Sequence, residues 1–173
     1  MQKLVKKARK GDKLAFMALI EEYEDAIYRT AYVYVKNEND ALDVAQETAA
    51  RAFSRISSLK EPEYFKTWLI KITINASIDL LRSKKKIVQL QPEYHESIER
   101  QDENIPLSLT LRSLLDDLTE REKGIILLKY YHGHTFTEIS TIMEMPAGSI
   151  KSVLYRALHK MRYQMKEEDI YEQ

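Results

Sequence analysis

The sequence contains no cysteine, and this absence excludes several classes of protein at once. Disulfide scaffolds, thiol catalysis and zinc sites with cysteine ligands all need a sulfur atom that the chain does not have. Glycine and proline are scarce as well, with four of each among 173 residues. Because sandwiches and barrels need many turns, this scarcity and the long runs of helix-forming residues predict an all-α protein.

Long apolar stretches are also missing. The longest uninterrupted aliphatic run has four residues, Ile125–Leu128, whereas a membrane-spanning helix needs about 20 apolar residues. The first residues, MQKLVKKARKGDK, are basic and polar and do not resemble a secretory signal. The sequence therefore predicts a soluble, cytoplasmic protein that does not insert into a membrane.

No motif typical of an enzyme is present. The chain has no glycine-rich phosphate loop, no nucleophile elbow and no paired histidine and carboxylate motif for zinc. His132 and His134 are the only close pair of histidines, and no clear third ligand accompanies them. We therefore expect two surface histidines, no metal, no cofactor and no catalytic residue.

The formal net charge is zero, with 27 Lys and Arg against 27 Asp and Glu. The charges are unevenly spread, since residues 1–88 carry +5, residues 89–106 carry −4 and residues 107–173 carry −1. A neutral chain lacks the broad positive field that binds nucleic acid without selectivity. Local basic faces, and an acidic face for a basic protein partner, are compatible with this balance.

Three stretches of the N-terminal half have apolar residues at three- and four-residue intervals, which predicts amphipathic helices. Ser57–Tyr64 contains Pro62 and is predicted to be a loop that leads into the last of them. The three helices are expected over residues 13–35, from an N-cap at Asn39 to about Ile56, and over residues 65–86.

Residues 89–106 differ in character, because they are acidic, contain two prolines and show little apolar periodicity. Such a composition is typical of a linker. Fully extended, these 18 residues reach ~60 Å at ~3.3 Å per residue. We therefore expect two helical domains, residues 1–88 and 107–173, with the linker between them.

The C-terminal half carries the clearest DNA-binding pattern. After a helix expected near residues 107–118, Thr119 and Thr135 each begin a capping box that predicts a helix start. A turn then leads from the helix at Thr135 to a second helix, in which Pro146–Lys166 contains five Lys or Arg and no acid. A basic helix held by a short partner helix is the arrangement that enters the DNA major groove.

Two sets of residues follow from this helix pair. Ile139, Ile142, Met145, Ile150 and Leu154 are spaced to form the core between the two helices. The opposite face is expected to contact DNA through Ser149, Lys151, Ser152, Tyr155, Arg156 and Lys160.

Three stretches carry a family resemblance. PAGSIKSVLYRA at residues 146–157 resembles region 4.2 of bacterial extracytoplasmic-function sigma factors, whose helix reads the promoter −35 element. FKTWLIKITINASIDLLR at residues 65–82 is similar to regions 2.3–2.4 of the same family. DALDVAQET at residues 40–48, with Ala52 and Phe53, resembles region 2.2. The resemblance covers nearly the whole chain apart from the linker and both tails.

Four positions depart from the family pattern. Val153 and Leu158 stand where basic residues are usual, so the recognition helix has fewer phosphate contacts than is typical. Ser140 and Glu144 replace the small and glycine-like residues that are common in the turn.

The resemblance implies a sigma factor that binds core RNA polymerase, recognises −35 and −10 promoter elements and assists promoter opening without catalysing a reaction. The implied partners are promoter DNA, the β′ clamp helices and β flap of the polymerase, and an anti-sigma factor, which in this family is often anchored in the membrane. The residues implied in −10 recognition and melting are Tyr64, Phe65, Lys66, Trp68, Lys71, Asn75 and Arg82. Those implied in polymerase docking are Asp40, Asp43, Gln46 and Glu47.

Alternatives remain open at several of these positions. Phe65 and Trp68 either stack on unpaired bases or pack in the core. The acidic stripe of residues 40–47 is either a docking face or a solvated surface. The docking alternative gains weight because the lysines near the linker do not explain the stripe. Asp79 is expected to cap the helix or to pair with an arginine such as Arg82. The alternative function is a stand-alone helix-turn-helix repressor or activator, which binds duplex DNA without polymerase.

Overall fold

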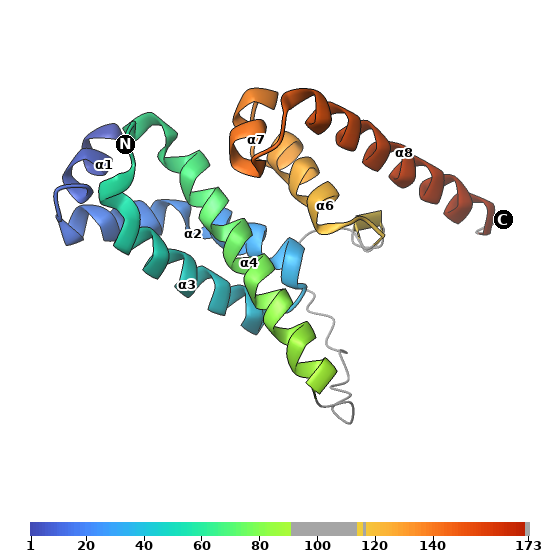
Figure 1. Cartoon of the computed structure of the whole chain (residues 1–173), viewed down its shortest axis with the longest axis horizontal. Helices are drawn as coiled ribbons and strands as arrows, with labels where there is room; N and C mark the ends of the chain where they lie inside the picture. Colours follow the sequence, from blue (N-terminus) through green and yellow to red (C-terminus); the bar gives the residue numbers. More distant parts are fainter. Residues whose placement is uncertain (91–113, 116, 172–173) are drawn as a thin grey trace. The chain divides into compact units, whose positions relative to one another are not determined.

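The structure, a computed structural model, describes residues 1–90, 114–115 and 117–171. Within these residues it consists of helices and turns with no strand (Figure 1), which confirms the all-α expectation. Contacts divide the chain into two units, residues 1–102 and 103–173. Most of the expected linker and of the helix near residues 107–118 lies outside the described residues. No helix in the described part is long and apolar enough to cross a membrane.

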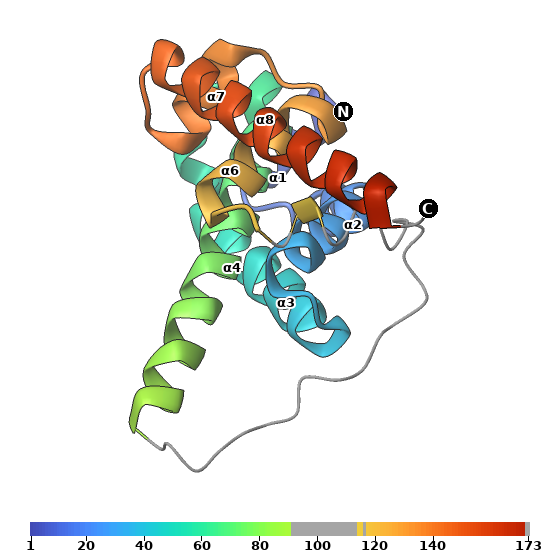
Figure 2. The ribbon, with the colours of Figure 1, turned by 90° about the vertical axis from the view of Figure 1, so that its right-hand side faces the viewer.

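The first unit is built on three helices that pack against one another, with a short helix at the N-terminus (Figures 1 and 2). Both views show the last turns of α4 extending past α2 and α3. Its elements are α1 (Gln2–Ala8), α2 (Lys13–Val35), α3 (Glu38–Arg55), the 3₁₀ turns η1 (Ile56–Ser58) and η2 (Pro62–Tyr64), and α4 (Phe65–Leu90). Helix α1 is a feature that the sequence analysis missed, and α4 continues into the first residues of the expected linker.

The start of α3 differs from the expectation. Asn37, rather than Asn39, is the N-cap, and its side chain accepts a hydrogen bond of 3.0 Å from the backbone N–H of Asp40. Helix α2 ends where Lys36 takes a left-handed conformation with φ of 55°. This reversal leaves Asn37 as the first extended residue, so the helix begins two residues earlier than the sequence suggested.

The core of the first unit joins α1, α2, α3 and α4. Phe65, Leu69 and Ile72 lie on one side of α4 and are at most 7% exposed. Each large apolar side chain buried in this way contributes about 1.5–3 kcal/mol. The other buried members of this core are Val5, Ala8, Ala15, Phe16, Leu19, Ile27, Ala52, Ile56 and Leu59.

The second unit places a helix-turn-helix on a short preceding helix. Ile139, Ile142, Ile150 and Leu154 are buried, as their spacing predicted, and Met145 is half-buried. Its helices are α6 (Glu120–Ile126), the π-helical turn η3 (Leu127–Tyr131), α7 (Phe136–Met143) and α8 (Ala147–Tyr171).

Candidate nucleic-acid and polymerase interfaces

Two hydrogen-bond arrangements set the geometry of the α7–α8 pair. At the start of α7, the backbone N–H of Thr135 donates to the Glu138 carboxylate at 2.7 Å, and Thr135 Oγ1 accepts from the N–H of Glu138 at 3.2 Å. At its end, Glu144 adopts a left-handed φ of 54°, and the Ser140 hydroxyl donates to the carbonyl of Met145. Ser140 and Glu144, two of the four residues that depart from the family pattern, therefore form the turn themselves.

The outward face of α8 has the composition that the sequence predicted. Ser149, Lys151, Ser152 and Arg156 are exposed, and Tyr155 is 67% exposed. Val153 belongs to the opposite side, because it is only 8% exposed. An apolar residue at this position suits the core, so the missing basic residue leaves no gap in the exposed face.

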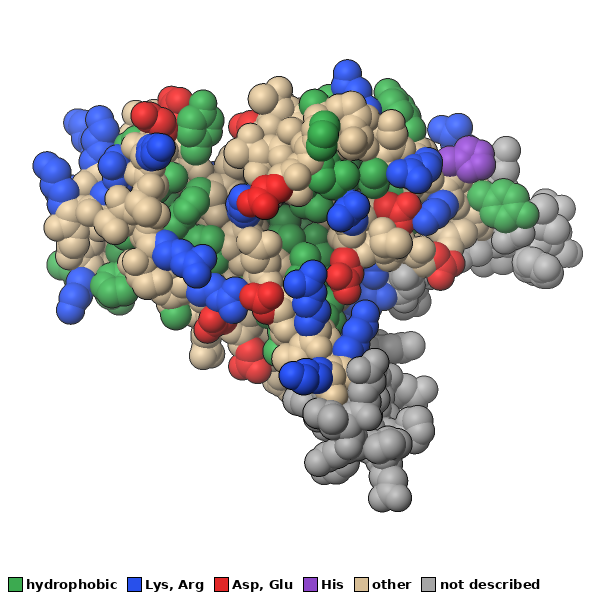
Figure 3. Space-filling model, viewed as in Figure 1, with side chains coloured by type: hydrophobic (Ala, Val, Ile, Leu, Met, Phe, Trp, Pro, Cys, Tyr) green, Lys and Arg blue, Asp and Glu red, His purple; other side chains and the backbone are tan. Residues whose placement is uncertain are grey.

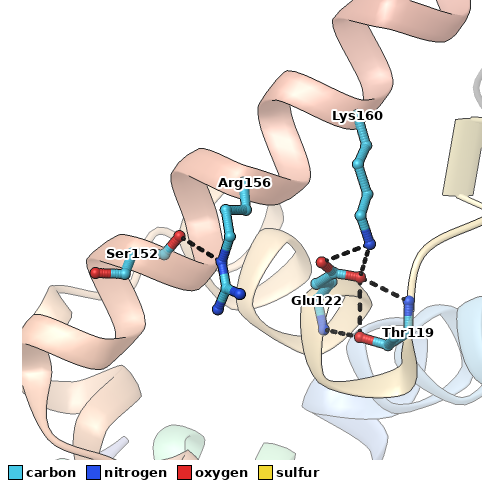
Figure 4. A network of polar contacts seen from close by, with 5 residues as sticks. All are labelled: Thr119, Glu122, Ser152, Arg156 and Lys160. Atoms are coloured by element: carbon cyan, nitrogen blue, oxygen red, sulfur yellow. Dashed lines mark hydrogen bonds and ion pairs between the residues drawn. The ribbon is translucent and has the colours of Figure 1, made fainter.

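Lys160 lies one turn beyond Arg156 and its side chain is 46% exposed, but it is also engaged within the second unit. Its Nζ lies 2.9 and 3.0 Å from the two carboxylate oxygens of Glu122 on α6 (Figure 4). Glu122 also accepts hydrogen bonds from the backbone N–H and the hydroxyl of Thr119, both at 2.9 Å. The DNA contact expected of Lys160 stays a prediction, and within the protein its ammonium group ties α8 to the start of α6.

This ion pair affects the acidity of Glu122. Burial by itself raises the pKa of the Glu122 carboxyl. The hydrogen bonds from Lys160 and Thr119 together lower the pKa by more than burial raises it, so the pKa of Glu122 lies below its ordinary value. The carboxylate is therefore charged at neutral pH and holds Lys160 through a charge-assisted hydrogen bond.

The ring of Phe136 is close to two lysines, Lys129 and Lys151, and neither Phe136 nor Lys129 was identified from the sequence. Lys129 Nζ is 4.7 Å from the ring centroid, and Lys151 Nζ is 5.4 Å from it. Both distances are within the range of cation–π attraction. The ring therefore restrains Lys151, which carries the first positive charge of α8.

The two histidines contradict the expectation of surface positions. His132 and His134 are 8% and 5% exposed, and their rings are 6.0 Å apart. The π-helical turn draws them inward, because the N–H of His132 bonds to the carbonyl of Leu127 and that of His134 to Leu128. The described residues contain no group of three or more side chains placed to hold a metal ion.

In the first unit, burial decides between the alternatives for Phe65 and leaves those for Trp68 open. Phe65 is 2% exposed, so it packs in the core. A role in −10 melting would require an exposed face for base stacking, which Phe65 does not present. Trp68 is half-buried and its ring lies 5.8 Å from that of Phe65. Tyr64, at the end of η2, is 50% exposed and is the aromatic side chain of this set most open to solvent.

The polar residues predicted to contact the −10 region lie along α4. Asn75 and Arg82 are exposed, whereas Lys66 and Lys71 are half-buried. Towards the end of α4, Arg82 is followed by exposed lysines at 84–86, and Figure 3 shows basic side chains over this part of the helix.

The acidic stripe of α3 is linked to α4 by two sets of ion pairs. Lys84 Nζ lies 2.8 Å from Asp40, so a lysine near the linker does account for part of the stripe, contrary to the expectation. Arg51 contacts Glu47 at 2.6 Å and Asp79 at 2.7 Å, so Asp79 pairs with an arginine as expected, and that arginine is Arg51.

Because of these ion pairs, the residues of the stripe differ in how accessible they are to a protein partner. Hydrogen bonds to Asp79 and then to Glu47 raise the pKa of Arg51, so the arginine stays charged between them. Asp43 and Gln46 are exposed on α3. The part of the stripe most open to a partner is therefore its middle.

Comparison with known proteins identifies the family. Residues 19–87 match the family model for sigma-70 region 2, and residues 114–163 match that for sigma-70 region 4. RNA polymerase sigma factor SigV of Bacillus subtilis is 35% identical over 164 residues, 95% of this chain and 99% of that protein. ECF RNA polymerase sigma factor SigW of the same organism is 30% identical over 96% of this chain and 97% of its own length. The chain belongs to the extracytoplasmic-function group of the sigma-70 family.

Solved structures support the fold of this sigma factor. CnrH, determined with the cytosolic domain of CnrY, has a TM-score of 0.73 at 20% identity and covers 96% of this chain and 97% of its own. RpoE of Bartonella quintana, determined with the anti-sigma factor NepR, has a TM-score of 0.75 at 22% identity and covers 87% of this chain and 96% of its own.

The two matched regions do not include the N-terminal end of the sigma factor. Region 2 begins inside α2 and ends in α4, and region 4 runs from before α6 into α8. Helix α1 therefore lies outside both matched regions.

Proposed function

We propose that this sigma factor binds core RNA polymerase and directs it to promoters through one interface in each unit. The observation that carries the proposal is the outward face of α8, where exposed Lys151, Ser152, Tyr155 and Arg156 lie opposite a buried apolar face. We assign −35 recognition to residues 107–173, polymerase binding and −10 opening to residues 1–88, and the connection between them to residues 89–106.

At −35, the proposed contacts divide by chemistry. Lys151 and Arg156 can donate to guanine edges or to phosphates, and Ser149 and Ser152 can contact either. Tyr155 offers an apolar plane to thymine methyl groups or sugars. A good bidentate base contact provides about 1–3 kcal/mol of discrimination, so a single helix of this kind needs a second interface for accurate promoter choice.

At −10, Tyr64 and the exposed part of Trp68 are proposed to stack on unpaired bases. Each such stack contributes about 1–3 kcal/mol, which offsets the unstacking cost of a few kcal/mol. Asn75 is proposed to hydrogen-bond in the same region. Lys66, Lys71 and Arg82 are proposed to contact the phosphate backbone.

Polymerase docking is proposed at the acidic stripe of α3, against the β′ clamp helices, while region 4 faces the β flap. Because Asp43 is exposed, Asp43→Lys should weaken affinity for core polymerase by about tenfold or more through like-charge repulsion. Glu24→Lys on α2 is the matched control, since it reverses another exposed acid that lies outside the stripe. Equal affinity of the two variants in a fluorescence binding assay would remove the stripe from the interface.

We further propose that the protein acts in the cytoplasm, where its polymerase works, and that an anti-sigma factor holds it inactive. The anti-sigma partner is supported by family membership and by the complexes in which CnrH and RpoE were determined. A membrane anchor, as is frequent in this family, would be part of the anti-sigma factor and not of this chain.

Run-off transcription with purified core polymerase tests the function. Wild-type protein should add specific start sites that depend on the −35 sequence, and Lys151→Ala should lower this −35-dependent activity about tenfold. Arg121→Ala, at an exposed arginine of α6, should leave it unchanged. No specific start site with wild-type protein, together with tight binding of the free protein to duplex DNA, would favour a stand-alone repressor or activator.

A further inference from the structure

Helix α1 and the turn after it carry a lysine-rich surface to which no role has been assigned. Lys3, Lys6, Lys7 and Lys10 are all exposed. A spacing of three and four residues places Lys3, Lys6 and Lys7 on one side of α1, and Lys10 follows in the turn. Figure 3 shows basic side chains gathered over this end of the first unit.

The lysines stand on a rigid support. Val5 and Ala8, on the other side of α1, are 0% and 3% exposed and belong to the core of the unit. After the helix, the N–H groups of Arg9, Lys10 and Gly11 bond to the carbonyls of Val5, Lys7 and Ala8 at 2.9–3.0 Å. Because the backbone is held, the four lysines are presented from fixed positions, and binding does not have to order this segment of the main chain.

The same helix is attached to the loop that precedes α4. Arg9 Nη1 donates a hydrogen bond of 3.0 Å to the carbonyl of Lys60, and α1 also contacts η2. This loop ends at Tyr64, the exposed aromatic residue proposed to stack on a −10 base. The lysine surface is thus a neighbour of the proposed −10 site.

The charge of this segment fits a polyanion. Residues 1–13 contain six Lys or Arg and one acid, Asp12, and the Asp12 side chain already caps α2 by accepting from the N–H of Ala15. From Lys3 to Lys7 the surface extends ~6 Å along α1 at ~1.5 Å per residue, and Lys10 continues it in the turn. The helical part alone matches about two nucleotide steps of ~3.4 Å along one strand.

We propose that Lys3, Lys6, Lys7 and Lys10 bind the phosphates of the promoter strand that adjoins the −10 bases. The inference rests on the proposed function and extends the DNA surface beyond the matched region 2. An anionic membrane is the competing polyanion, because Leu14 and Met17 at the start of α2 are 78% and 65% exposed. DNA is favoured for two reasons. Helix α1 is attached to the loop that precedes α4 and ends at Tyr64, and the apolar side chains of α1 itself are buried, so they cannot enter a membrane.

The first test uses holoenzyme made from the full chain and core polymerase. A variant with Gln at all four lysines is compared with one that has Arg at the same positions, since Arg keeps the charge. Each single-strand phosphate contact that is lost makes the salt dependence of promoter binding shallower by about 0.7. We expect the slope to fall by about 2–3 with Gln and to stay at its wild-type value with Arg.

The second test locates the contact. Because the chain has no cysteine, Lys7→Cys provides a unique attachment point for a DNA-cleaving iron chelate. Cleavage by the holoenzyme should fall within a few nucleotides of the −10 element. Lys36→Cys, on the exposed residue that ends α2, is the control position.

The outcomes separate the possibilities. An unchanged salt slope with Gln, or cleavage from Lys7→Cys no closer to −10 than from the control, would overturn the proposal. Loss of binding to phosphatidylserine vesicles with an unchanged DNA slope would assign the lysines to a membrane surface instead. Failure of the wild-type holoenzyme to start transcription at specific sites refutes the proposed function itself. Thermal unfolding followed by Trp68 fluorescence verifies that the variants are folded.

Discussion

Replacing Glu122 by Gln tests how the recognition helix is held. The substitution preserves the side-chain shape, and Gln is accepted at this position of a capping box, so the start of α6 should remain intact. What is lost is the negative charge that the Lys160 ammonium contacts at 2.9 and 3.0 Å. The variant therefore isolates the ion pair between α6 and α8.

The magnitude follows from burial. A hydrogen bond to a charged group contributes about 1.5–3 kcal/mol. The side chain of Glu122 is 10% exposed, but that of Lys160 is 46% exposed, so water screens one end of the pair. We therefore expect Glu122→Gln to lower the stability of the second unit by about 1–1.5 kcal/mol.

Hydrogen exchange is the appropriate assay, because it reports the two units separately. The amides of α6 and α8 should exchange about five- to tenfold faster in Glu122→Gln, which corresponds to this loss. The single tryptophan, Trp68, lies in the first unit and provides an internal control, since its unfolding signal should not move. Lys160→Gln and the double variant complete a cycle whose coupling should be about 1 kcal/mol.

The pH dependence gives a second signature. The pKa of Glu122 is lowered in the folded protein, so its contribution to stability is complete above the ordinary value of 4.5 and is lost as the pH falls through the folded pKa. Glu122→Gln should flatten this part of the acid unfolding profile of the second unit. Coupling below about 0.3 kcal/mol, or an acid profile that keeps its wild-type shape, would refute the reasoning.

Three further outcomes are expected. Asn37→Ala should lower the unfolding free energy by about 1 kcal/mol through loss of the α3 cap, whereas Asn39→Ala should be nearly neutral; a larger effect at Asn39 would restore the sequence assignment. Phe136→Leu should weaken −35-dependent binding of the holoenzyme about two- to fivefold by removing the ring beneath Lys151, and Phe136→Tyr should not; equal losses argue against the cation–π contact. Arg51→Met should cost about 0.5–1 kcal/mol in denaturant unfolding, with the loss shrinking as salt is added; a salt-independent loss would point to packing instead.

Local features were predicted well because the information that determines them is local. The periodicity of apolar residues gave the bounds of α2, Lys13–Val35, and the buried side of the α7–α8 pair. The two capping boxes gave the starts of α6 and α7, since Thr and Glu three residues apart satisfy each other's hydrogen bonds. Helix α1 was missed because so short a segment, with few apolar residues, has no clear period.

The interpretation of single side chains depended on which element each one meets. Phe65 and Trp68 share the same aromatic chemistry, but only packing against α2 and α3 shows that Phe65 is in the core. His134 is polar and follows a turn, yet the π-helical geometry of η3 buries it. No periodic pattern distinguishes these cases.

By itself, the sequence determined the all-α class, most helix bounds and the exposed face of α8, because spacing and caps act within a few residues. Only the tertiary structure decided which charged side chains pair with one another. Lys160 meets Glu122 across 38 residues, and Lys84 meets Asp40 across 44. The sequence does not distinguish a lysine that is available to phosphate from one that pairs with a carboxylate. The packing of one helix on another determines which of the two it is.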